Sequence, residues 1–282
     1  MVTLKITFYG VRGSTPCACE SNQRIGGNTA CVVVEGDGFD PLVFDLGTGL
    51  RFWGLDVLDH GPAPLHATAL VSHLHWDHVQ GLPFFPPIHL PETQLHIVGP
   101  KQVGASLEEA FNAFLCPPYF PVRLDQLIGT VTFEEAGEDP IHHGSAIITT
   151  ADVPHVGPTI GYRVEHEGRS VAYVSDHQQP GVGATEVAGS VLELCRDVDV
   201  LIHDAQYTDD EFALRHDWGH CTVDYAIEVA RQANARRLVL FHHDPAHDDD
   251  LVDRLGVVAA ERSRSVGGPE IVVGFEGLVL EA

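Results

Sequence analysis

Short apolar runs, each ending in turn-forming residues, recur along the chain and predict β-strands. Some alternate polar and apolar positions, as half-buried strands do, and others are continuously apolar, as fully buried strands are. Both kinds occur in each half of the chain. The predicted strands are Leu4–Tyr9, Ala30–Glu35, Leu42–Asp45, Ala67–Ser72, Val131–Glu134, Ala146–Val153, Ile160–Glu165, Ser170–Ser175, Val198–His203 and Arg237–Phe241.

Helices are expected where apolar residues recur every three or four positions. One predicted helix follows Thr222 and runs through Ala233. The hydroxyl of Thr222 is placed to cap its first turn. Acidic residues open the last helix, as the helix dipole favours. The other predicted helices are Val103–Leu115, Thr185–Cys195 and Asp249–Arg262.

Turn signals and the order of the elements predict the architecture. His166-Glu-Gly168 is a short hairpin turn between two strands, and a last hairpin is expected over Glu270–Glu281. Strands in both halves, with helices between and after them, indicate two packed sheets covered by helices. No long linker or fixed-period repeat divides the chain, so residues 1–282 are expected to form a single domain.

Charge and composition exclude several classes of protein. Forty Asp and Glu against sixteen Lys and Arg give a net charge of −24, which disfavours an extensive nucleic-acid-binding surface. No apolar run approaches about 18 residues, so no membrane span is expected. The N-terminus lacks the layout of a signal peptide, which indicates a cytoplasmic protein whose six cysteines stay thiols. Cys17-Ala-Cys19 alone is too sparse for a zinc site.

The densest chemical signal is Ser72-His-Leu-His-Trp-Asp-His78, directly after an apolar strand. Its imidazole and carboxylate groups suit Zn²⁺ first, with Mn²⁺ or Fe as alternatives. A chance surface cluster is a poor explanation for four such groups within six residues. The candidate ligands in this segment are His73, His75, Asp77 and His78.

Three more candidate ligands share one context, in which an apolar strand delivers a polar side chain at its C-terminal end. His155 follows the strand that ends at Val153, and Asp176 follows the strand that ends at Ser175. His242 and His243 both follow Phe241, so either could be the last ligand. Active sites collect at such strand ends in layered folds.

These residues, in this order, resemble the metallo-β-lactamase superfamily. The resemblance implies an α/β fold, a four-layer αββα sandwich of two mixed sheets flanked by helices, with two divalent metal ions in a cleft. It prefers His242 to His243, because the family's last ligand directly follows the strand. It assigns one metal to His73, His75 and His155, the second to Asp77, His78 and His242, and the bridge to Asp176.

Two further segments resemble loops of the ribonuclease Z-like phosphodiesterases. They are His203-Asp-Ala-Gln-Tyr207 and Gly219-His-Cys-Thr222, in which Asp204 replaces the family's Glu and Cys221 its Ser. The resemblance implies that His220 contacts a phosphoryl oxygen or protonates the leaving oxygen, with Asp204 orienting it. The amides of the following helix N-terminus are expected to attract the anion. The alternative is that both residues serve only as cap and turn.

The sequence therefore predicts a metal-dependent hydrolase, a phosphodiesterase that uses a water molecule activated by two metal ions. Asp77 would also orient that water. The opening Gly10–Pro16 and the segment Gly26–Thr29 resemble a bacterial branch that includes cyclic-nucleotide phosphodiesterase-like proteins. A small, cyclic-nucleotide-like phosphodiester is the expected partner, and an apolar face beside the cleft is compatible with a homodimer.

Other activities remain as alternatives. A tRNA 3′-processing endonuclease is less favoured, because residues 155–176 leave room only for a hairpin where one branch of the family carries a basic arm. The segment Glu92–Leu127, taken as an insertion, holds only Lys101 and Arg123 as strong bases. A lactone, ester or thioester hydrolase on the same metal site is the nearest rival, and a non-catalytic metal-binding protein is the remaining one.

Overall fold

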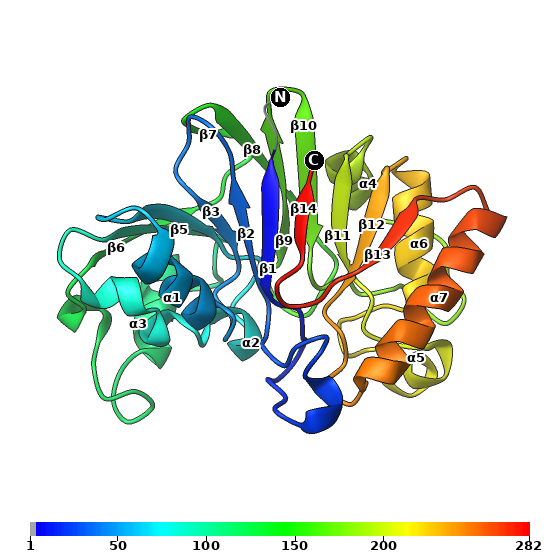
Figure 1. Ribbon diagram of the computed structural model, residues 1–282, viewed down its shortest axis with the longest axis horizontal. Coiled ribbons are helices and arrows are strands. Elements are labelled where there is room, and N and C mark those ends of the chain that lie inside the picture. The colour runs from blue at the N-terminus through cyan, green and yellow to red at the C-terminus, as the bar shows by residue number, and fades with distance from the viewer. Residues whose placement is uncertain (1–3) are drawn as a thin grey trace.

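The computed structural model describes residues 4–282, which form two seven-stranded mixed β-sheets (Figure 1). The first sheet has the strand order β14 (Val279–Glu281), β1 (Lys5–Gly10), β2 (Cys31–Glu35), β3 (Leu42–Phe44), β4 (His66–Leu70), β5 (Gln94–Gly99) and β6 (Thr130–Glu135). The second has the order β13 (Glu270–Val273), β12 (Arg237–Phe241), β11 (Val200–Asp204), β10 (Arg169–Val174), β9 (Ile160–His166), β8 (Ala146–Asp152) and β7 (Ile141–His143).

Helices cover the outer faces of both sheets, which confirms the predicted four layers. The outer face of the first sheet carries α1 (Leu50–His60) and α3 (Leu107–Phe114). The outer face of the second carries α4 (Gly189–Cys195), α6 (Val223–Gln232) and α7 (Asp249–Ser265). Two short helices, α2 (Trp76–Val79) and α5 (Asp209–Arg215), lie in loops. None of the helices within residues 4–282 is long and apolar enough to cross a membrane.

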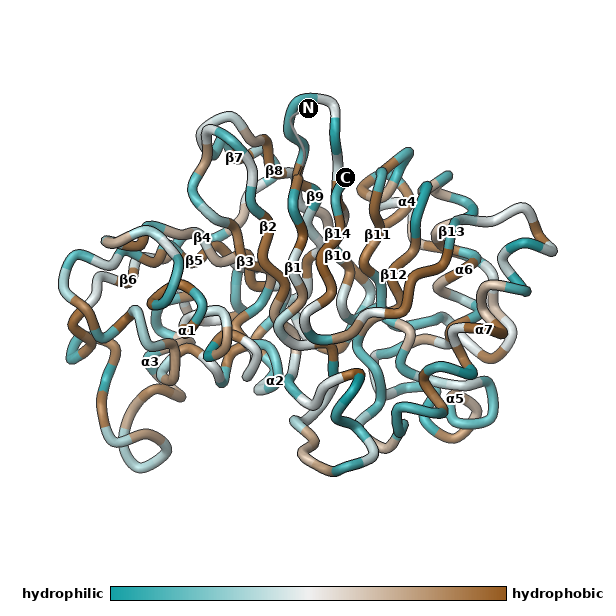
Figure 2. Tube along the Cα trace, in the orientation of Figure 1, coloured by the Kyte–Doolittle hydropathy of each residue, from teal (hydrophilic) through white to brown (hydrophobic). Residues whose placement is uncertain are grey.

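Three apolar layers hold the sandwich together. The inner layer lies between the sheets, and each outer layer lies between a sheet and its helices. Strand β4 shows the alternation, because Ala67 and Ala69 belong to an outer layer and Leu70 to the inner one. Figure 2 shows apolar residues concentrated along the central strands. Across the inner layer, the rings of Phe44 and Tyr173 stack 4.7 Å apart and join the sheets.

The predicted hairpin over residues 270–281 is wrong. Strand β13 pairs parallel with β12, with Val272 opposite Val239, whereas β14 pairs antiparallel with β1, with Leu280 opposite Ile6. The chain therefore crosses from one sheet to the other at its end. The segment Glu92–Leu127 is not a pure insertion either, because it contains β5, which lies between β4 and β6.

Strand direction brings the candidate site together. Strands β10, β11 and β12 run parallel, and β8 has the same direction because both it and β10 are antiparallel to β9. The loops that follow β8, β10, β11 and β12 therefore leave from one edge of the second sheet. The loop after β4 meets them from the first sheet, where the amide of Ile160 donates to the carbonyl of Ser72.

Candidate metal centre

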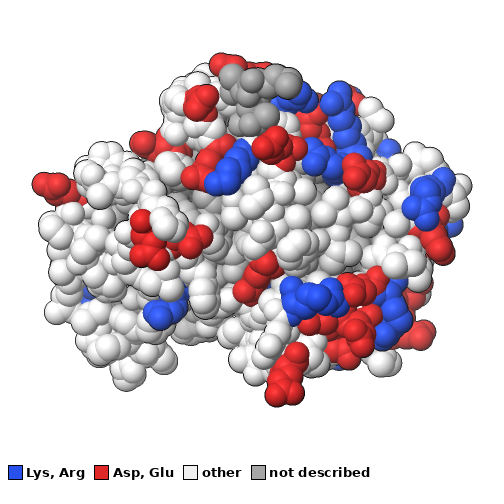
Figure 3. All heavy atoms as spheres, viewed as in Figure 1, with Lys and Arg blue, Asp and Glu red and all other residues white. Residues whose placement is uncertain are grey.

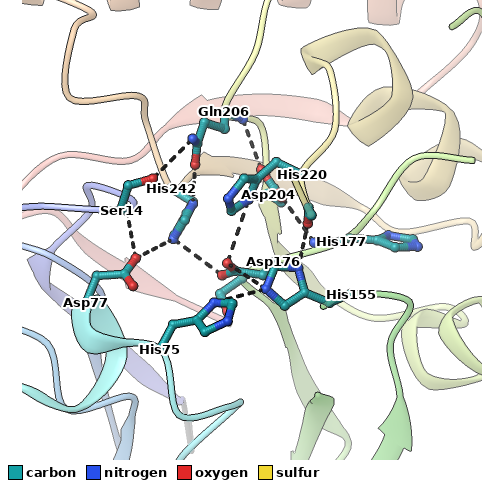
Figure 4. Close-up of polar contacts among 12 residues, drawn as sticks. Ser14, His75, Asp77, His155, Asp176, His177, Asp204, Gln206, His220 and His242 are labelled. Carbon is teal, nitrogen blue, oxygen red and sulfur yellow. Dashed lines mark hydrogen bonds and ion pairs between the residues drawn. The ribbon is translucent and has the colours of Figure 1, made fainter. Parts of the chain in front are cut away.

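The first group of candidate ligands gathers around one oxygen of Asp176 (Figure 4). The Nε2 atoms of His73 and His155 each lie 3.7 Å from Asp176 Oδ2. His75 Nδ1 lies 3.3 Å from His155 Nε2. These four residues come from three loops, those after β4, β8 and β10, so the group exists only in the folded protein.

The second group lies at the other oxygen of the same carboxylate. The Nε2 atoms of His78 and His242 lie 3.2 and 3.3 Å from Asp176 Oδ1. Asp77 Oδ2 is 3.2 Å from His242 Nε2 and 3.1 Å from His78 Nε2. Each oxygen of Asp176 therefore faces a different group, which is the placement a bridging carboxylate requires.

Three of the candidate histidine rings are held by hydrogen bonds on the side away from the site. Nδ1 of His78 donates to Asp45 at 2.7 Å, Nδ1 of His242 to the side-chain oxygen of Gln206 at 2.7 Å, and Nδ1 of His155 to the carbonyl of Gly219 at 2.7 Å. With these Nδ1 protons committed, the Nε2 lone pairs point into the site. Such partners fix the tautomer and orientation of metal-binding histidines.

The donor set fits divalent cations. Among the described residues, His73 Nε2 and Asp176 Oδ1 are buried and have no hydrogen-bond partner, although buried polar atoms are normally satisfied. Burial favours the neutral acid, but the imidazoles of His242 and His78 hold the pKa of Asp176 well below its usual range. Imidazole nitrogens converging on an ionised carboxylate suit Zn²⁺, Mn²⁺ or Fe²⁺.

Two residues that orient the site, Asp45 and Gln206, were absent from the sequence prediction. Asp45 also accepts hydrogen bonds from the amide of Ser72 at 2.7 Å and the hydroxyl of Tyr173 at 2.7 Å. Its position directly after strand β3 is the same signal that identified Asp176 and His242. For Gln206 no sequence signal existed beyond its place in the loop after β11.

The opening segment also builds the site. The amide of Ser14 donates to Asp77 Oδ2 at 2.7 Å, and a Cβ on Gly13 would lie 2.2 Å from His242 Nδ1. Arg12 is fully buried and holds this segment by donating to carbonyls of Gly26 and His247. Glycine at position 13 is therefore required by a close approach to a candidate ligand.

Asp204 and His220 form a pair beside the two groups. His220 Nδ1 donates to Asp204 Oδ2 at 3.1 Å, and the same nitrogen is 3.6 Å from Asp176 Oδ2. Asp204 is itself fixed by the amides of His177 and Gln206, each at 3.0 Å. Burial disfavours the charged imidazole, but Asp204 outweighs it and raises the pKa of His220 to about 9.

The expectation that the N-terminus of the following helix attracts an anion stays a prediction, and two of the amides there already donate to protein acceptors. Thr222 caps α6, as predicted, and its hydroxyl accepts from the amide of Tyr225. The amide of Val223 donates to the carbonyl of Tyr207, and that of Thr222 to Gln179. Beside these amides, the imidazole of His220 is the side chain of this loop that lies next to Asp176.

The remaining histidine and cysteine candidates lie outside both groups. His243 donates to the carbonyl of Gly274 at 2.9 Å, which separates it from His242. His177 pairs with His203 at 3.0 Å, and His247 contacts Glu211. All six cysteines are free thiols, as predicted. Of the two early cysteines, Cys17 accepts a hydrogen bond from Asn22, and neither belongs to a metal-binding group of the described residues.

Most basic side chains are paired with acids. On the face shown in Figure 3, most Lys and Arg lie against Asp and Glu, and one basic patch at the lower left stands apart from them. Ten of the sixteen Lys and Arg are paired, which reduces the number of cations free to contact a polyanion. The paired residues are Lys5, Arg12, Arg24, Arg163, Arg169, Arg196, Arg215, Arg231, Arg236 and Arg262.

Comparisons with known proteins show which proteins this chain is similar to. A sequence model of the β-lactamase superfamily domain matches residues 44–243. Ribonuclease Z of Haloarcula marismortui is 26% identical over 330 aligned positions, covering 98% of this chain and 96% of the relative. The alignment has more positions than this chain has residues, so the relative carries residues that are absent here.

Solved structures share the fold over nearly the whole chain. The metallo-β-lactamase fold protein YhfI from Bacillus subtilis has a TM-score of 0.72 at 19% identity, covering 100% of both chains. Human tRNase Z, short form, has a TM-score of 0.66 at 20% identity, covering 98% of both chains. Unliganded yeast PDE1 has a TM-score of 0.68 at 14% identity, covering 100% of both chains.

Proposed function

The chain belongs to the metallo-β-lactamase superfamily and is a hydrolase of that superfamily, and from this premise we propose that it is a metal-dependent phosphodiesterase. Its substrates are small phosphodiesters of the cyclic-nucleotide kind. The observation that carries the proposal is the Asp204–His220 pair, whose imidazole lies 3.6 Å from the carboxylate that both candidate metal groups share. Zinc is the metal we expect, because imidazole and carboxylate donors suit it.

The residues have separate roles in this reaction. Bound divalent cations would supply an activated water molecule and offset the charge that develops on the phosphoryl oxygens. Asp77 has one oxygen held by the amide of Ser14, which leaves the other to orient the attacking water. His220 has Nδ1 committed to Asp204, which leaves a proton on Nε2 for the leaving oxygen.

A second candidate is tRNA 3′ processing, which relatives named ribonuclease Z favour. Two observations weigh against it. Residues 155–176 contain only the β9–β10 hairpin, whose turn is Glu167-Gly168, and most basic side chains are paired. A tRNA would therefore find little cationic surface to bind. A small substrate needs only the site itself.

Hydrolysis of bis(p-nitrophenyl) phosphate tests the proposal. We expect the protein loaded with Zn²⁺ or Mn²⁺ to release p-nitrophenol, and the Asp77→Ala variant in the same buffer to release none above background. Turnover of lactones, esters or thioesters, with none of the phosphodiester, would replace the proposal with the rival hydrolase. The dyad of Asp204 and His220 would then have a structural role.

A further inference from the structure

Two of the three tryptophans of the chain are exposed, and both adjoin the candidate site. Trp76 is 60% exposed and lies between His75 and Asp77, and Trp218 is 62% exposed and lies two residues before His220. The third, Trp53, is only 3% exposed and stacks on Phe85 in an outer apolar layer. Large aromatic side chains are usually buried, so two exposed indoles beside one site require an explanation.

The segments that carry the two indoles meet at His155. Its Nε2 is 3.3 Å from Nδ1 of His75, the neighbour of Trp76. Its Nδ1 donates at 2.7 Å to the carbonyl of Gly219, the neighbour of Trp218. One segment belongs to the first sheet's loop after β4, and the other connects α5 to α6. The backbone segments that carry the indoles therefore meet at His155, one from each half of the site.

The candidate ligand between these segments is exposed to solvent. Of the candidate metal ligands, His75 is the exposed one, whereas Asp77, His78, Asp176 and His242 are buried. A substrate must therefore enter beside His75, next to Trp76. The organic groups of a phosphodiester held at Asp176 would extend toward the exposed indoles.

Each indole packs against one neighbouring side chain and remains partly exposed to solvent. The ring of Trp76 meets Phe114 edge-on, with centroids 5.8 Å apart. The guanidinium of Arg215 lies 5.6 Å over the ring of Trp218 and is held by Asp244 at 3.2 Å. Because Arg215 covers one face of the Trp218 ring, the exposed surface of Trp218 lies on the remainder of the ring. Such preorganised aromatic surfaces suit flat, uncharged groups.

We propose that Trp76 and Trp218 bind the nucleobase side of the substrate, so that this site prefers phosphodiesters that carry a nucleobase over those that carry small alkyl groups. The inference rests on the proposed phosphodiesterase function and names its substrate class. Base-on-indole stacking tolerates any base, because every base presents a π face. The preference is therefore for nucleotides in general rather than for one base.

A matched pair of chromogenic substrates tests the inference. Thymidine 5′-(p-nitrophenyl phosphate) and methyl p-nitrophenyl phosphate share the leaving group, and only the first carries a base. In the metal-loaded protein, Trp76→Ala or Trp218→Ala should raise KM for the thymidine ester at least about fivefold, from the known strength of base–aromatic stacking. KM for the methyl ester should not change, and Trp76→Phe and Trp218→Phe should retain most of the affinity.

Leu58→Ala, which removes an exposed apolar side chain in the last turn of α1, is the control and should change neither KM. Equal rises in KM for both esters in the tryptophan variants would indicate a structural role and overturn the inference. No change for either ester would overturn it as well.

A binding measurement separates this inference from the proposed function. If the protein hydrolyses neither ester, the phosphodiesterase proposal fails, and tryptophan fluorescence then decides the stacking on its own. Thymidine 5′-monophosphate should quench the emission of the metal-loaded protein, ribose 5-phosphate should not, and each Trp→Phe variant should lose part of the quenching. Absence of nucleotide quenching, with or without cleavage of a precursor tRNA, would overturn the inference.

Discussion

His220 donates from Nδ1 to Asp204, and it also lies with Asp176 and His242 in a third set of residues that could hold a metal ion. The family resemblance assigns the metals to other residues, so metal content and turnover must be measured together to find the role of His220. Asp77 and Asp176 each contact several candidate ligands at once, so a change at either residue would affect metal binding directly.

We predict that His220→Ala keeps the metal content of the protein and lowers turnover of a phosphodiester by at least about tenfold, because the proton donor for the leaving oxygen is lost. His216→Ala, which changes an exposed histidine four residues earlier, is the control. Metal content is measured by mass spectrometry of the dialysed protein, and turnover with bis(p-nitrophenyl) phosphate. Unchanged turnover would remove His220 from the mechanism.

Gly13 gives a second test at the residue scale. We predict that Gly13→Ala displaces the ring of His242, because the added Cβ would lie 2.2 Å from its Nδ1, and weakens binding of one metal ion per chain. Gly181→Ala is the control, because a Cβ there meets no atom within 4 Å. Isothermal titration with Zn²⁺ measures the affinity and the number of bound ions in the metal-free form of each variant. If Gly13→Ala bound Zn²⁺ with the affinity of the unchanged protein, the segment around residue 13 would be able to shift without weakening metal binding, and the prediction would be wrong.

The sequence predicted the residues that meet at the site but not those that orient them. The candidate ligands sit in a dense motif or directly after apolar strands, and both signals are local. Gln206 and Ser14 act only through neighbours more than 30 residues away in the chain, His242 and Asp77. Contacts of this kind depend on how the sheets pack, which no local pattern contains.

At the scale of elements, strands whose runs are fully apolar were predicted well, and β12 has the predicted bounds. Helix α1 was missed, because exposed Phe52, Leu55 and Leu58 obscure the buried stripe of Leu50, Trp53 and Val57. The final hairpin was wrong because β13 and β14 pair with strands from opposite ends of the chain. Pairing over such distances leaves no mark in a short window of sequence.

The β9–β10 turn was predicted correctly and gives a test of stability. Glu167 and Gly168 have φ of 47° and 79°, as a two-residue hairpin turn of the right twist requires. We predict that Gly168→Ala lowers the free energy of unfolding by about 1 kcal/mol, because alanine disfavours positive φ. Gly137, which also has open space around it but no positive φ, is the control and should tolerate alanine. Urea denaturation measures the free energy of unfolding of each variant. An equal loss of stability in the two variants would contradict the role of positive φ.

At the scale of the whole molecule, the sandwich and the site depend on each other. Tyr173 of the second sheet donates to Asp45 of the first, and Asp45 in turn orients His78. The packing of the two sheets therefore sets the geometry at the candidate metal centre. Residues from both sheets are needed to complete either group of ligands.

The net charge of −24 and the paired basic side chains predict weak binding to nucleic acid. We expect a Kd for tRNA weaker than about 100 μM at physiological salt, the weak end of non-specific binding. Fluorescence anisotropy of a labelled precursor tRNA measures this, with the Asp77→Ala variant to prevent cleavage. Submicromolar binding would favour tRNA processing over a small substrate.

The central claim is that two metal ions, which the residues around Asp176 would hold, support phosphodiester hydrolysis. Its most direct test is titration of the metal-free protein with Mn²⁺ while hydrolysis of bis(p-nitrophenyl) phosphate is followed. We predict that turnover reaches its plateau at two ions per chain and that Asp176→Asn, which keeps the size of the side chain, does not reach it. Full turnover with a single ion per chain, or with none, would contradict the account.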